Sequence, residues 1–361
     1  MSDTAPFICS IVAKNYIAFA RTLARSFLEQ HPDGRCFVLI VDDTAGFVEP
    51  DQEPFELVTL DRLDIPRVQN LALGYDITEF STSVKPYFLE YLFREYNPET
   101  LLYLDPDILV TDSLSPLVAE LDGADIILTP HLDTDYPDDG LMPDDSHIMR
   151  SGIFNLGFIG LRRCANVDDF LKWWQTKLYD RCLVDPWKGY MVDQKFIDYA
   201  YVLFRKIRLV RDPGYNVAYW NIHSRTIDRA DDRWLCNGQP LRFFHFSNYK
   251  PEQPDRISGH QTRFTFAQRP DLERIFRHYH QLLMQNGYAE AVGWPYSWGQ
   301  YKDGSRVSLN GRVYFRTHPE LHELDDPFDY SAYSMGTRLR IHLLRAKGFT
   351  WRVAKSMFSR P

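Results

Sequence analysis

The feature that most constrains the fold is an apolar run at residues 101–104, which ends in Asp105, Pro106 and Asp107 and resumes at residues 108–110. A run this apolar is typical of a strand buried on both faces, as in parallel sheets covered by helices. Ligands of open α/β sheets bind at the carboxyl ends of the strands. The sequence therefore predicts an α/β fold with two carboxylates at its ligand-binding edge.

The two carboxylates have two interpretations. Asp105 and Asp107 offer the hard oxygen ligands that Mg²⁺ and Mn²⁺ prefer, and such a metal suits a diphosphate. Pro106 removes a backbone donor and stiffens the link between them. However, aspartate and proline are also ordinary turn residues. Taken alone, the motif leaves a metal site and a polar turn equally open.

Alternating strands and helices surround this run. Residues 7–13 and 36–41 are apolar, and residues 15–30 between them place apolar side chains at three- and four-residue spacing. A strand, a helix and a strand in succession form a right-handed unit of a parallel sheet. By the same criteria, further strands are expected at residues 55–60, 124–129, 154–161, 207–210 and 241–246, and helices at residues 82–96, 167–179, 193–201 and 272–286.

Two smaller features of the pattern carry structural expectations. Gly157 and Gly160 interrupt the strand at residues 154–161, and glycine inside a strand often marks a close approach of the backbone to another group. Residues 131–145 are acidic, contain proline and lack any period. Such a segment fits a mobile lid beside the active edge or a solvated surface loop.

We expect one domain over residues 1–265, with a nucleotide-binding half at 1–112 and a substrate half at 113–265. A mostly helical extension is expected over residues 266–361. Its last part, residues 337–361, combines seven arginines and lysines with apolar residues and no acid. That composition favours contact with an anionic membrane surface, and a helix docked on the acidic body is the alternative.

Bulk properties exclude several classes of protein. The net charge of −8 argues against nucleic acid as a general partner. The five cysteines are scattered and form no close pairs, which favours a reducing cytoplasm without disulfides or a zinc site. We recognise no signal peptide and no run long enough to span a bilayer. The expected location is therefore cytoplasmic, with peripheral contact at the inner membrane.

Four separated patterns occur in a fixed order along the chain. Lys85 precedes the aspartate pair at 103–107, and Phe-Asn-Leu-Gly at 154–157, Val-Asp-Gln at 192–194 and His-Phe-Ser-Asn-Tyr-Lys-Pro at 245–251 follow it. In this order and spacing the chain resembles nucleotide-sugar glycosyltransferases of the GT-A fold. The greatest resemblance is to the retaining family 8 type, which includes glycogenin and bacterial lipopolysaccharide galactosyltransferases.

The resemblance, which covers roughly residues 7–251, implies a function. The chain would be a hexosyltransferase that moves a sugar from a nucleotide diphosphosugar, with UDP as the favoured nucleotide, to an acceptor hydroxyl. Retention of configuration and a glycan or lipid-linked acceptor of the bacterial cell surface are implied as well. In such retaining transfer the departing diphosphate itself can deprotonate the acceptor, so no protein base is needed.

The resemblance also implies roles for individual residues. Asp105, Asp107 and His245 would hold Mn²⁺ or Mg²⁺. The other implied contacts are Ala13, Asn15 and Tyr16 for base and ribose, Lys85 and Lys250 for the donor phosphates or sugar, and Asn155, Asp193 and Gln194 as the catalytic group around the donor sugar.

Each of these residues also has an ordinary structural interpretation. Asn155 fits the cap of a strand bulge, Asp193 a helix N-cap, and His245 a core histidine. The chain also departs from the family pattern, because Asn248 and Glu252 stand where glycine and tryptophan are usual. Glycine lets a backbone approach phosphates, so the phosphate geometry is open at Asn248.

Three other functions remain in competition. An inverting transferase needs a carboxylate within hydrogen-bond reach of the acceptor, and Asp193 or an aspartate of the 131–145 segment could serve. A haloacid dehalogenase-type phosphatase also has two aspartates after a strand, but it wants Thr or Val at position 109, which is Leu, and it places them on its first strand. The third is a sugar-binding protein without activity, which the intact set of candidate residues disfavours.

Overall fold

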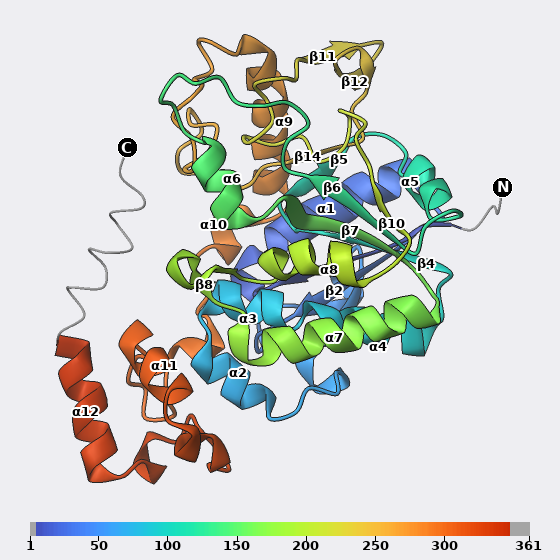
Figure 1. The fold of residues 1–361 in the computed structure, drawn as a ribbon. Helices are drawn as coiled ribbons and strands as arrows, with labels where there is room; N and C mark the ends of the chain where they lie inside the picture. Colours follow the sequence, from blue (N-terminus) through green and yellow to red (C-terminus); the bar gives the residue numbers. More distant parts are fainter. Residues whose placement is uncertain (1–4, 347–361) are drawn as a thin grey trace.

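The computed structural model describes residues 5–346 (Figure 1). The part of the basic segment from residue 347 to residue 361 lies outside the described residues, so the expected membrane contact of that part stays a prediction.

A seven-stranded sheet forms the centre of the molecule, in the order β10-β6-β7-β4-β1-β2-β3. Only β7 runs antiparallel to its neighbours β4 and β6, and all other pairs are parallel. This confirms the predicted mixed, mostly parallel sheet. The strands are β1 (Phe7–Val12), β2 (Arg35–Ile40), β3 (Glu56–Thr59), β4 (Thr100–Leu104), β6 (Ile126–Pro130), β7 (Phe154–Arg162) and β10 (Ile207–Leu209).

Helices cover both faces of the sheet (Figure 1). Alternate side chains of β4 enter different cores because successive residues of a strand point to opposite faces. Leu101 and Tyr103 pack in the layer of α4 (Lys85–Tyr96) and α7 (Ala165–Arg181). Leu102 packs in the layer of α1 (Ile17–Gln30). The uninterrupted apolar run is thus explained by burial on both sides.

The helix predicted at residues 82–96 is divided in two. Asp76 caps α3 (Ile77–Ser83) by accepting the backbone N–H groups of Thr78 and Glu79, and Val84 separates α3 from α4. The remaining helices are α2 (Val68–Gly74), α5 (Ser115–Glu120), α6 (Asp145–Ser151), α8 (Ile197–Leu203), α9 (Pro270–Gln285), α10 (Tyr288–Ala291), α11 (Leu309–Arg316) and α12 (Met335–Ala346).

A two-stranded ribbon leaves the main sheet after the aspartate pair. β5 (Ile108–Val110) pairs antiparallel with β14 (Phe243–His245), and His245 lies opposite Ile108. This register brings His245 next to Asp107. The smaller strands are β8 (Val184–Asp185), β9 (Tyr190–Met191), β11 (Ile227–Ala230), β12 (Arg233–Cys236) and β13 (Gln239–Pro240).

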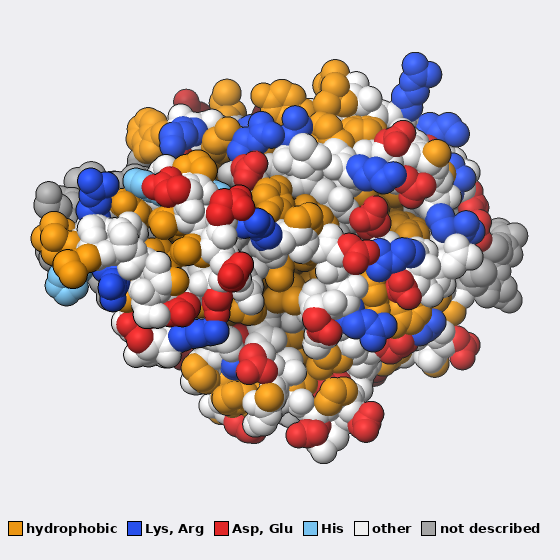
Figure 2. Space-filling view, turned by 90° about the horizontal axis from the view of Figure 1, so that it is seen from below, with side chains coloured by type: hydrophobic (Ala, Val, Ile, Leu, Met, Phe, Trp, Pro, Cys, Tyr) orange, Lys and Arg blue, Asp and Glu red, His pale blue; other side chains and the backbone are white. Residues whose placement is uncertain are grey.

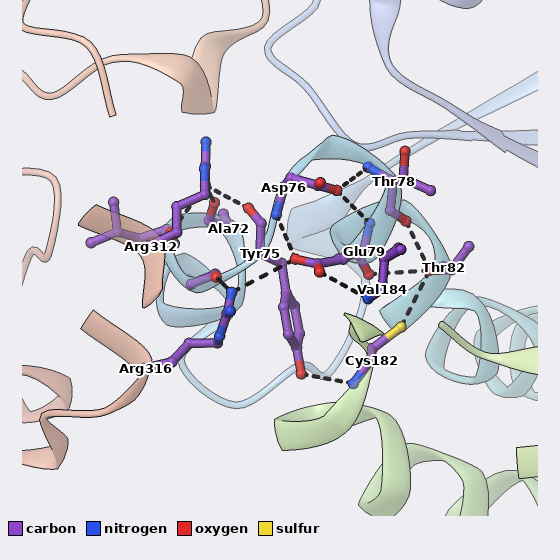
Figure 3. A network of polar contacts seen from close by, with 12 residues as sticks. Ala72, Tyr75, Asp76, Thr78, Glu79, Thr82, Cys182, Val184, Arg312 and Arg316 are labelled. Atoms are coloured by element: carbon purple, nitrogen blue, oxygen red, sulfur yellow. Dashed lines mark hydrogen bonds and ion pairs between the residues drawn. The ribbon is translucent and has the colours of Figure 1, made fainter. Parts of the chain in front are cut away.

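The C-terminal extension is helical in its described part, with no named strand between β14 and residue 346. Arg312 of α11 joins it to the body, because its buried guanidinium donates to the carbonyls of Ala72 at 2.7 Å, Leu73 at 3.0 Å and Tyr75 at 2.5 Å (Figure 3). These carbonyls close the carboxyl end of α2, where helix carbonyls lack helical partners. The boundary predicted at residue 265 stays a prediction.

A hollow of about 340 Å³ lies where α11 meets α2 and the end of α7. Leu71, Tyr75, Tyr179, Phe315 and Arg316 are among its lining residues. Figure 2 views the molecule from this side and shows hydrophobic side chains interspersed with both signs of charge.

Candidate functional site

The two aspartates and His245 form one cluster at the carboxyl edge of the sheet. Asp105 follows β4, Asp107 precedes β5, and their oxygens and a His245 ring nitrogen all lie within 4.8 Å of one another. The Nε2 atom of His245 is 3.0 Å from Asp107 and 3.8 Å from Asp105. Two carboxylates with an imidazole are a donor set that fits a divalent cation.

The other ring nitrogen of His245 contacts Asn216. The amide nitrogen of Asn216 donates to Thr129 Oγ1 at 2.8 Å and to Asn155 Oδ1 at 3.0 Å, so its oxygen is left as an acceptor. That oxygen lies 3.1 Å from His245 Nδ1. The Nδ1 atom therefore carries a proton and donates it to Asn216, so Nε2 is the nitrogen that faces Asp105 and Asp107. A histidine oriented in this way can offer Nε2 to a metal once that nitrogen is deprotonated.

Local electrostatics agree with a cluster built for a cation. Burial lowers the pKa of His245, but the carboxylates of Asp107 and Asp105 outweigh burial and hold the pKa above its ordinary value. The Tyr103 hydroxyl donates to Asp105 at 2.8 Å. The cluster thus holds more negative charge than its one histidine can balance.

Lys85 and Asp193 form a buried ion pair beside this cluster. Their charged atoms lie 2.5 Å apart, and Lys85 also donates to the carbonyl of Leu156 at 2.9 Å and lies 4.0 Å from the centre of the Tyr103 ring. Burial raises the pKa of Asp193, and the Lys85 ammonium opposes that rise. The Asp193 side chain does not cap the helical turn at residues 194–196, because it makes no hydrogen bond to the backbone of that turn.

Asn155 is the second residue of β7, and the Gln194 side chain contacts the backbone at Ser151 and Leu156, near the start of the same strand. Asn155 accepts from the backbone N–H of Gly157 at 3.1 Å, near the point where the β6–β7 register shifts. This contact matches the bulge interpretation, while the Asn216 contact ties Asn155 to His245 as well. Gln194 donates to the carbonyl of Ser151 at 2.9 Å. The catalytic roles expected for both residues stay predictions.

Gly157 is the close approach that a glycine within the strand predicts. A Cβ atom there would overlap His245 Cε1 and lie 2.7 Å from His245 Nδ1. Its carbonyl accepts from the backbone N–H of Asp105 at 2.8 Å. The absence of a side chain at Gly157 therefore makes room for the imidazole of His245.

The loop after β1 supplies the residues expected to hold a nucleoside. Ala13 is buried, the Asn15 side-chain oxygen is buried without a hydrogen-bond partner among residues 5–346, and the half-exposed Tyr16 stacks on Phe19 at 4.5 Å. Burial and then the nearby Asp107 raise the pKa of Tyr16. An orphaned acceptor beside an aromatic ring suits a polar ring ligand, and the assignment stays a prediction.

Lys250 is exposed and lines a small hollow together with Asn248. Asn248 has a φ of 54°, in the left-handed region that glycine adopts most readily and asparagine tolerates. The departure from glycine therefore preserves the backbone shape. Its side chain occupies space, however, and lies 2.6 Å from where a Cβ on Gly259 would stand.

Sequence reasoning missed three residues of the site: Thr129, His131 and Asn216. Thr129 and His131 come directly after the apolar residues of β6, as Asp105 does after β4, so they lie at the same edge of the sheet. That position in the sequence could have identified them as site residues. His131 packs edge-on against Trp220, which in turn packs edge-on against His245. Burial lowers the pKa of His131 to about 4.

Three aromatic residues of the segment 215–220 differ in burial. Tyr215 and Trp220 are buried, so they pack, and Tyr219 is half-buried. The acidic segment 131–145 is anchored, because Asp133 pairs with Arg225 at 3.1 Å and Asp139 with Arg263 at 2.5 Å. A lid movement of this segment stays a prediction.

Comparison with known sequences gives no named activity. No protein-family model matches the chain. It is 26% identical over 281 residues to the uncharacterized protein YfnF of Bacillus subtilis (strain 168), which covers 76% of this chain and 90% of YfnF. The uncharacterized protein YfnD of the same organism is 25% identical over 246 residues, 66% of this chain and 76% of YfnD.

Among solved structures, the chain is similar to several glycosyltransferases. The galactosyltransferase LgtC, in complex with donor and acceptor sugar analogs, has a TM-score of 0.48 at 17% identity and covers 77% of this chain and 95% of its own. The glycosyltransferase GlyE of Streptococcus pneumoniae TIGR4 has a TM-score of 0.45 at 14% identity, with 83% and 67% covered. The functional assignment therefore rests on the geometry of the site.

Proposed function

We propose that this chain is a metal-dependent glycosyltransferase of the GT-A type that moves a sugar from a nucleotide diphosphosugar to an acceptor hydroxyl. The observation that carries the proposal is the Asp105, Asp107 and His245 cluster at the carboxyl edge of the sheet, beside the buried pair of Lys85 and Asp193. A UDP-sugar is the proposed donor.

Each group of residues in the candidate site has its own proposed role. Asp105, Asp107 and His245 would hold Mn²⁺ or Mg²⁺, which when bound neutralises charge on the leaving diphosphate. Asn155 and Gln194 would offer their amide groups to hydroxyls of the donor sugar. Ala13, Asn15 and Tyr16 would bind base and ribose, and the exposed Lys250 would approach the diphosphate as a point charge.

Retention is proposed over inversion. An inverting enzyme needs a carboxylate free to take the acceptor proton. Asp193 is paired with Lys85, and Asp133 and Asp139 of the acidic segment are paired with arginines. Because Asp193, the carboxylate beside the cluster, is engaged in an ion pair, we favour the departing diphosphate as the proton acceptor over the remaining aspartates of the segment. A haloacid dehalogenase-type phosphatase is disfavoured because it places its aspartates after its first strand, whereas here three strands precede β4, the strand that leads into Asp105.

The proposed acceptor is a bacterial cell-surface glycan or glycolipid, reached from the cytoplasmic side of the inner membrane. None of the described helices is both long and apolar enough to cross a bilayer. Residues 337–361 are proposed to contribute peripheral contact. In the described part of this segment, Ile341 of α12 is buried, so that helix is partly docked on the extension.

A thermal-shift screen tests the donor. UDP-hexoses should raise the melting temperature of the full chain in the presence of Mn²⁺ and much less with chelator, because a ligand of the folded state stabilises it. A donor that stabilises equally with and without metal would contradict metal dependence.

Paired substitutions test the metal cluster. Asp105→Asn with Asp107→Asn should abolish Mn²⁺-dependent donor hydrolysis and sugar transfer, since both carboxylate charges are lost while side-chain size is kept. Asp122→Asn, at an exposed carboxylate, is the matched control. Unchanged activity of the double variant would refute the site. The anomeric configuration of the product, read by proton NMR, separates retention from inversion.

A further inference from the structure

A second surface of the molecule has features that the proposed reaction does not use. It comprises the carboxyl-terminal half of α7, the turn η4 (Pro186–Lys188) between β8 and β9, and α8, and we call it the α7–α8 face. A groove of about 440 Å³ runs across it. Four aromatic side chains line the groove: Trp173, Tyr190, Phe196 and Tyr199.

Large apolar side chains are exposed around this groove. Trp187 at the tip of η4 is 82% exposed, and Tyr199, Val202 and Leu203 of α8 are 64%, 81% and 60% exposed. Soluble proteins expose single apolar residues commonly, but contiguous patches mark surfaces that bind something. Since Tyr199 and Leu203 line the groove themselves, the exposed side chains and the groove form one surface.

Among the described residues, the groove is lined by four cationic and no acidic side chains, on a chain of net charge −8. Lys177, Arg181, Lys188 and Lys195 all line the groove. Lys188 is paired with Asp185 at 3.3 Å and Lys195 with Asp198 at 2.9 Å. Lys177 and Arg181 form no ion pair with any residue in the described range 5–346.

The helix dipole explains only part of this arrangement. Lys177 and Arg181 lie near the carboxyl end of α7, where cations are favourable even without a partner. That effect does not account for exposed Trp187, Val202 and Leu203 around them. Unpaired cations combined with exposed tryptophan and aliphatic side chains match the chemistry of an anionic lipid surface, where headgroups take the cations and the interface takes the apolar groups.

We propose that the α7–α8 face docks on an anionic membrane surface. This proposal rests on the proposed glycosyltransferase function, because docking would serve to bring the enzyme to an acceptor carried by lipid. Lys195 and Phe196 line the groove, while the preceding Gln194 bonds to Ser151 and lies beside Leu156 on the candidate-site side. Docking through this face therefore brings the candidate site close to acceptors carried by lipid.

Vesicle sedimentation with the full chain tests the docking. We expect binding to phosphatidylcholine vesicles that contain phosphatidylglycerol, little binding to phosphatidylcholine alone, and weakening by salt. Lys177→Gln with Arg181→Gln should weaken binding about thirtyfold, because each cation near an anionic surface contributes about a factor of five. Val202→Ser with Leu203→Ser should weaken it at every salt concentration.

Two controls make the result specific. Met284→Ser with Val292→Ser removes exposed apolar side chains elsewhere and should leave vesicle binding unchanged. Asp105→Asn with Asp107→Asn should also bind vesicles normally, so failure of the proposed function and failure of docking are separate results.

Three outcomes would overturn the proposal. One is a full chain that does not bind vesicles containing phosphatidylglycerol. Another is normal vesicle binding by both α7–α8 variants, which would assign binding to another part of the chain. The third is sedimentation velocity showing a dimer that these variants dissociate while vesicle binding is unaffected, which would make the face a contact between two copies.

Discussion

At the residue scale, the side chain of Asn216 decides which nitrogen of His245 faces the carboxylates. Its amide group makes all its described contacts within the site, to Thr129, Asn155 and His245, and each has a distinct donor or acceptor role. Such outer partners of a ligating histidine orient the ring and select its tautomer. Asn216 is therefore a positioning residue in the proposed metal centre.

Replacing Asn216 should weaken metal binding. We expect Asn216→Ala to reduce Mn²⁺ affinity about ten- to a hundredfold, because His245 loses the acceptor that holds its Nδ1 proton. Electron paramagnetic resonance of free Mn²⁺ measures this without relying on turnover. Thr129→Val removes a partner of Asn216 but not the His245 contact, and it should have a smaller effect. Equal affinity of wild type and Asn216→Ala would remove the positioning role.

His131 should make stability depend on pH. Its pKa is about 4 in the folded protein because of burial, whereas an unfolded histidine has a pKa of about 6.5. Between these values the unfolded state binds more protons, so stability falls as pH falls. At pH 5 the loss from this group is about 2 kcal/mol relative to neutral pH.

The measurement is urea unfolding of wild type and His131→Gln at pH 7 and pH 5. His131→Gln loses the titrating group, so its stability should fall by less than that of wild type over this interval. Other buried histidines contribute equally to both proteins and cancel in the comparison. An identical pH dependence in the two proteins would show that folding does not lower the pKa of His131.

At the element scale, β7 is the strand that makes room for the site. It runs antiparallel between β4 and β6, and its glycines face different neighbours. Gly157 lies under His245, whereas a Cβ on Gly160 would stand 2.5 Å from Ile127 Cγ1 in the core. Gly157 therefore affects the position of a proposed metal ligand, whereas Gly160 affects only the packing of the core.

Alanine substitutions at these two positions should differ in effect. Gly157→Ala should displace the His245 ring and lower Mn²⁺ affinity by about tenfold or more. Gly160→Ala should cost about 1–3 kcal/mol of stability by overpacking and leave Mn²⁺ affinity of the folded protein unchanged. Isothermal titration with Mn²⁺ and urea unfolding measure the two quantities. Loss of stability without loss of affinity in Gly157→Ala would contradict the steric argument.

At the scale of the whole molecule, two arginines of α11 join the C-terminal extension to the carboxyl end of α2. Besides Arg312, Arg316 donates to the Gly74 carbonyl and lies 3.7 Å from Glu79 (Figure 3). Glu79 in turn accepts from the backbone N–H of Val184 at 3.0 Å. This network links α2, α3, β8 and α11, which are distant in sequence.

Breaking this link should destabilise the protein. Arg312→Met should lower the free energy of unfolding by about 3 kcal/mol, because several carbonyls at the end of α2 lose a buried charged donor. Urea unfolding measures the change. Arg306→Met, at an exposed arginine of the same extension, is the control and should change stability by less than about 0.5 kcal/mol. Equal stabilities for the two variants would show that the extension is held elsewhere.

Much of the central sheet was predictable because its signals are local. The apolar runs of β1, β2 and β4 and the periodic spacing of α1 are visible within a few residues. The position of Asp105 and Asp107 at the carboxyl edge followed directly. The separation of β5 from the main sheet and the break at Val84 were not predicted, because both depend on what packs against them.

The residues of the candidate site were easier to predict than the contacts between them. His245 was expected as a ligand only through a resemblance, and its place beside Asp107 comes from the β5–β14 register. The contact of Lys85 with Asp193 joins residues separated by 108 positions (193 − 85), and nothing near either residue indicates it.

The sequence by itself determined the alternation of strands and helices and the carboxylates at the end of β4, because hydrophobic spacing and strand burial act over short stretches. The tertiary structure alone decided that Asn216 holds the ring of His245, that Gly157 leaves space for it, and that Lys85 pairs with Asp193. These contacts join segments that chain order does not relate, and the orientation of a side chain depends on every neighbour that surrounds it.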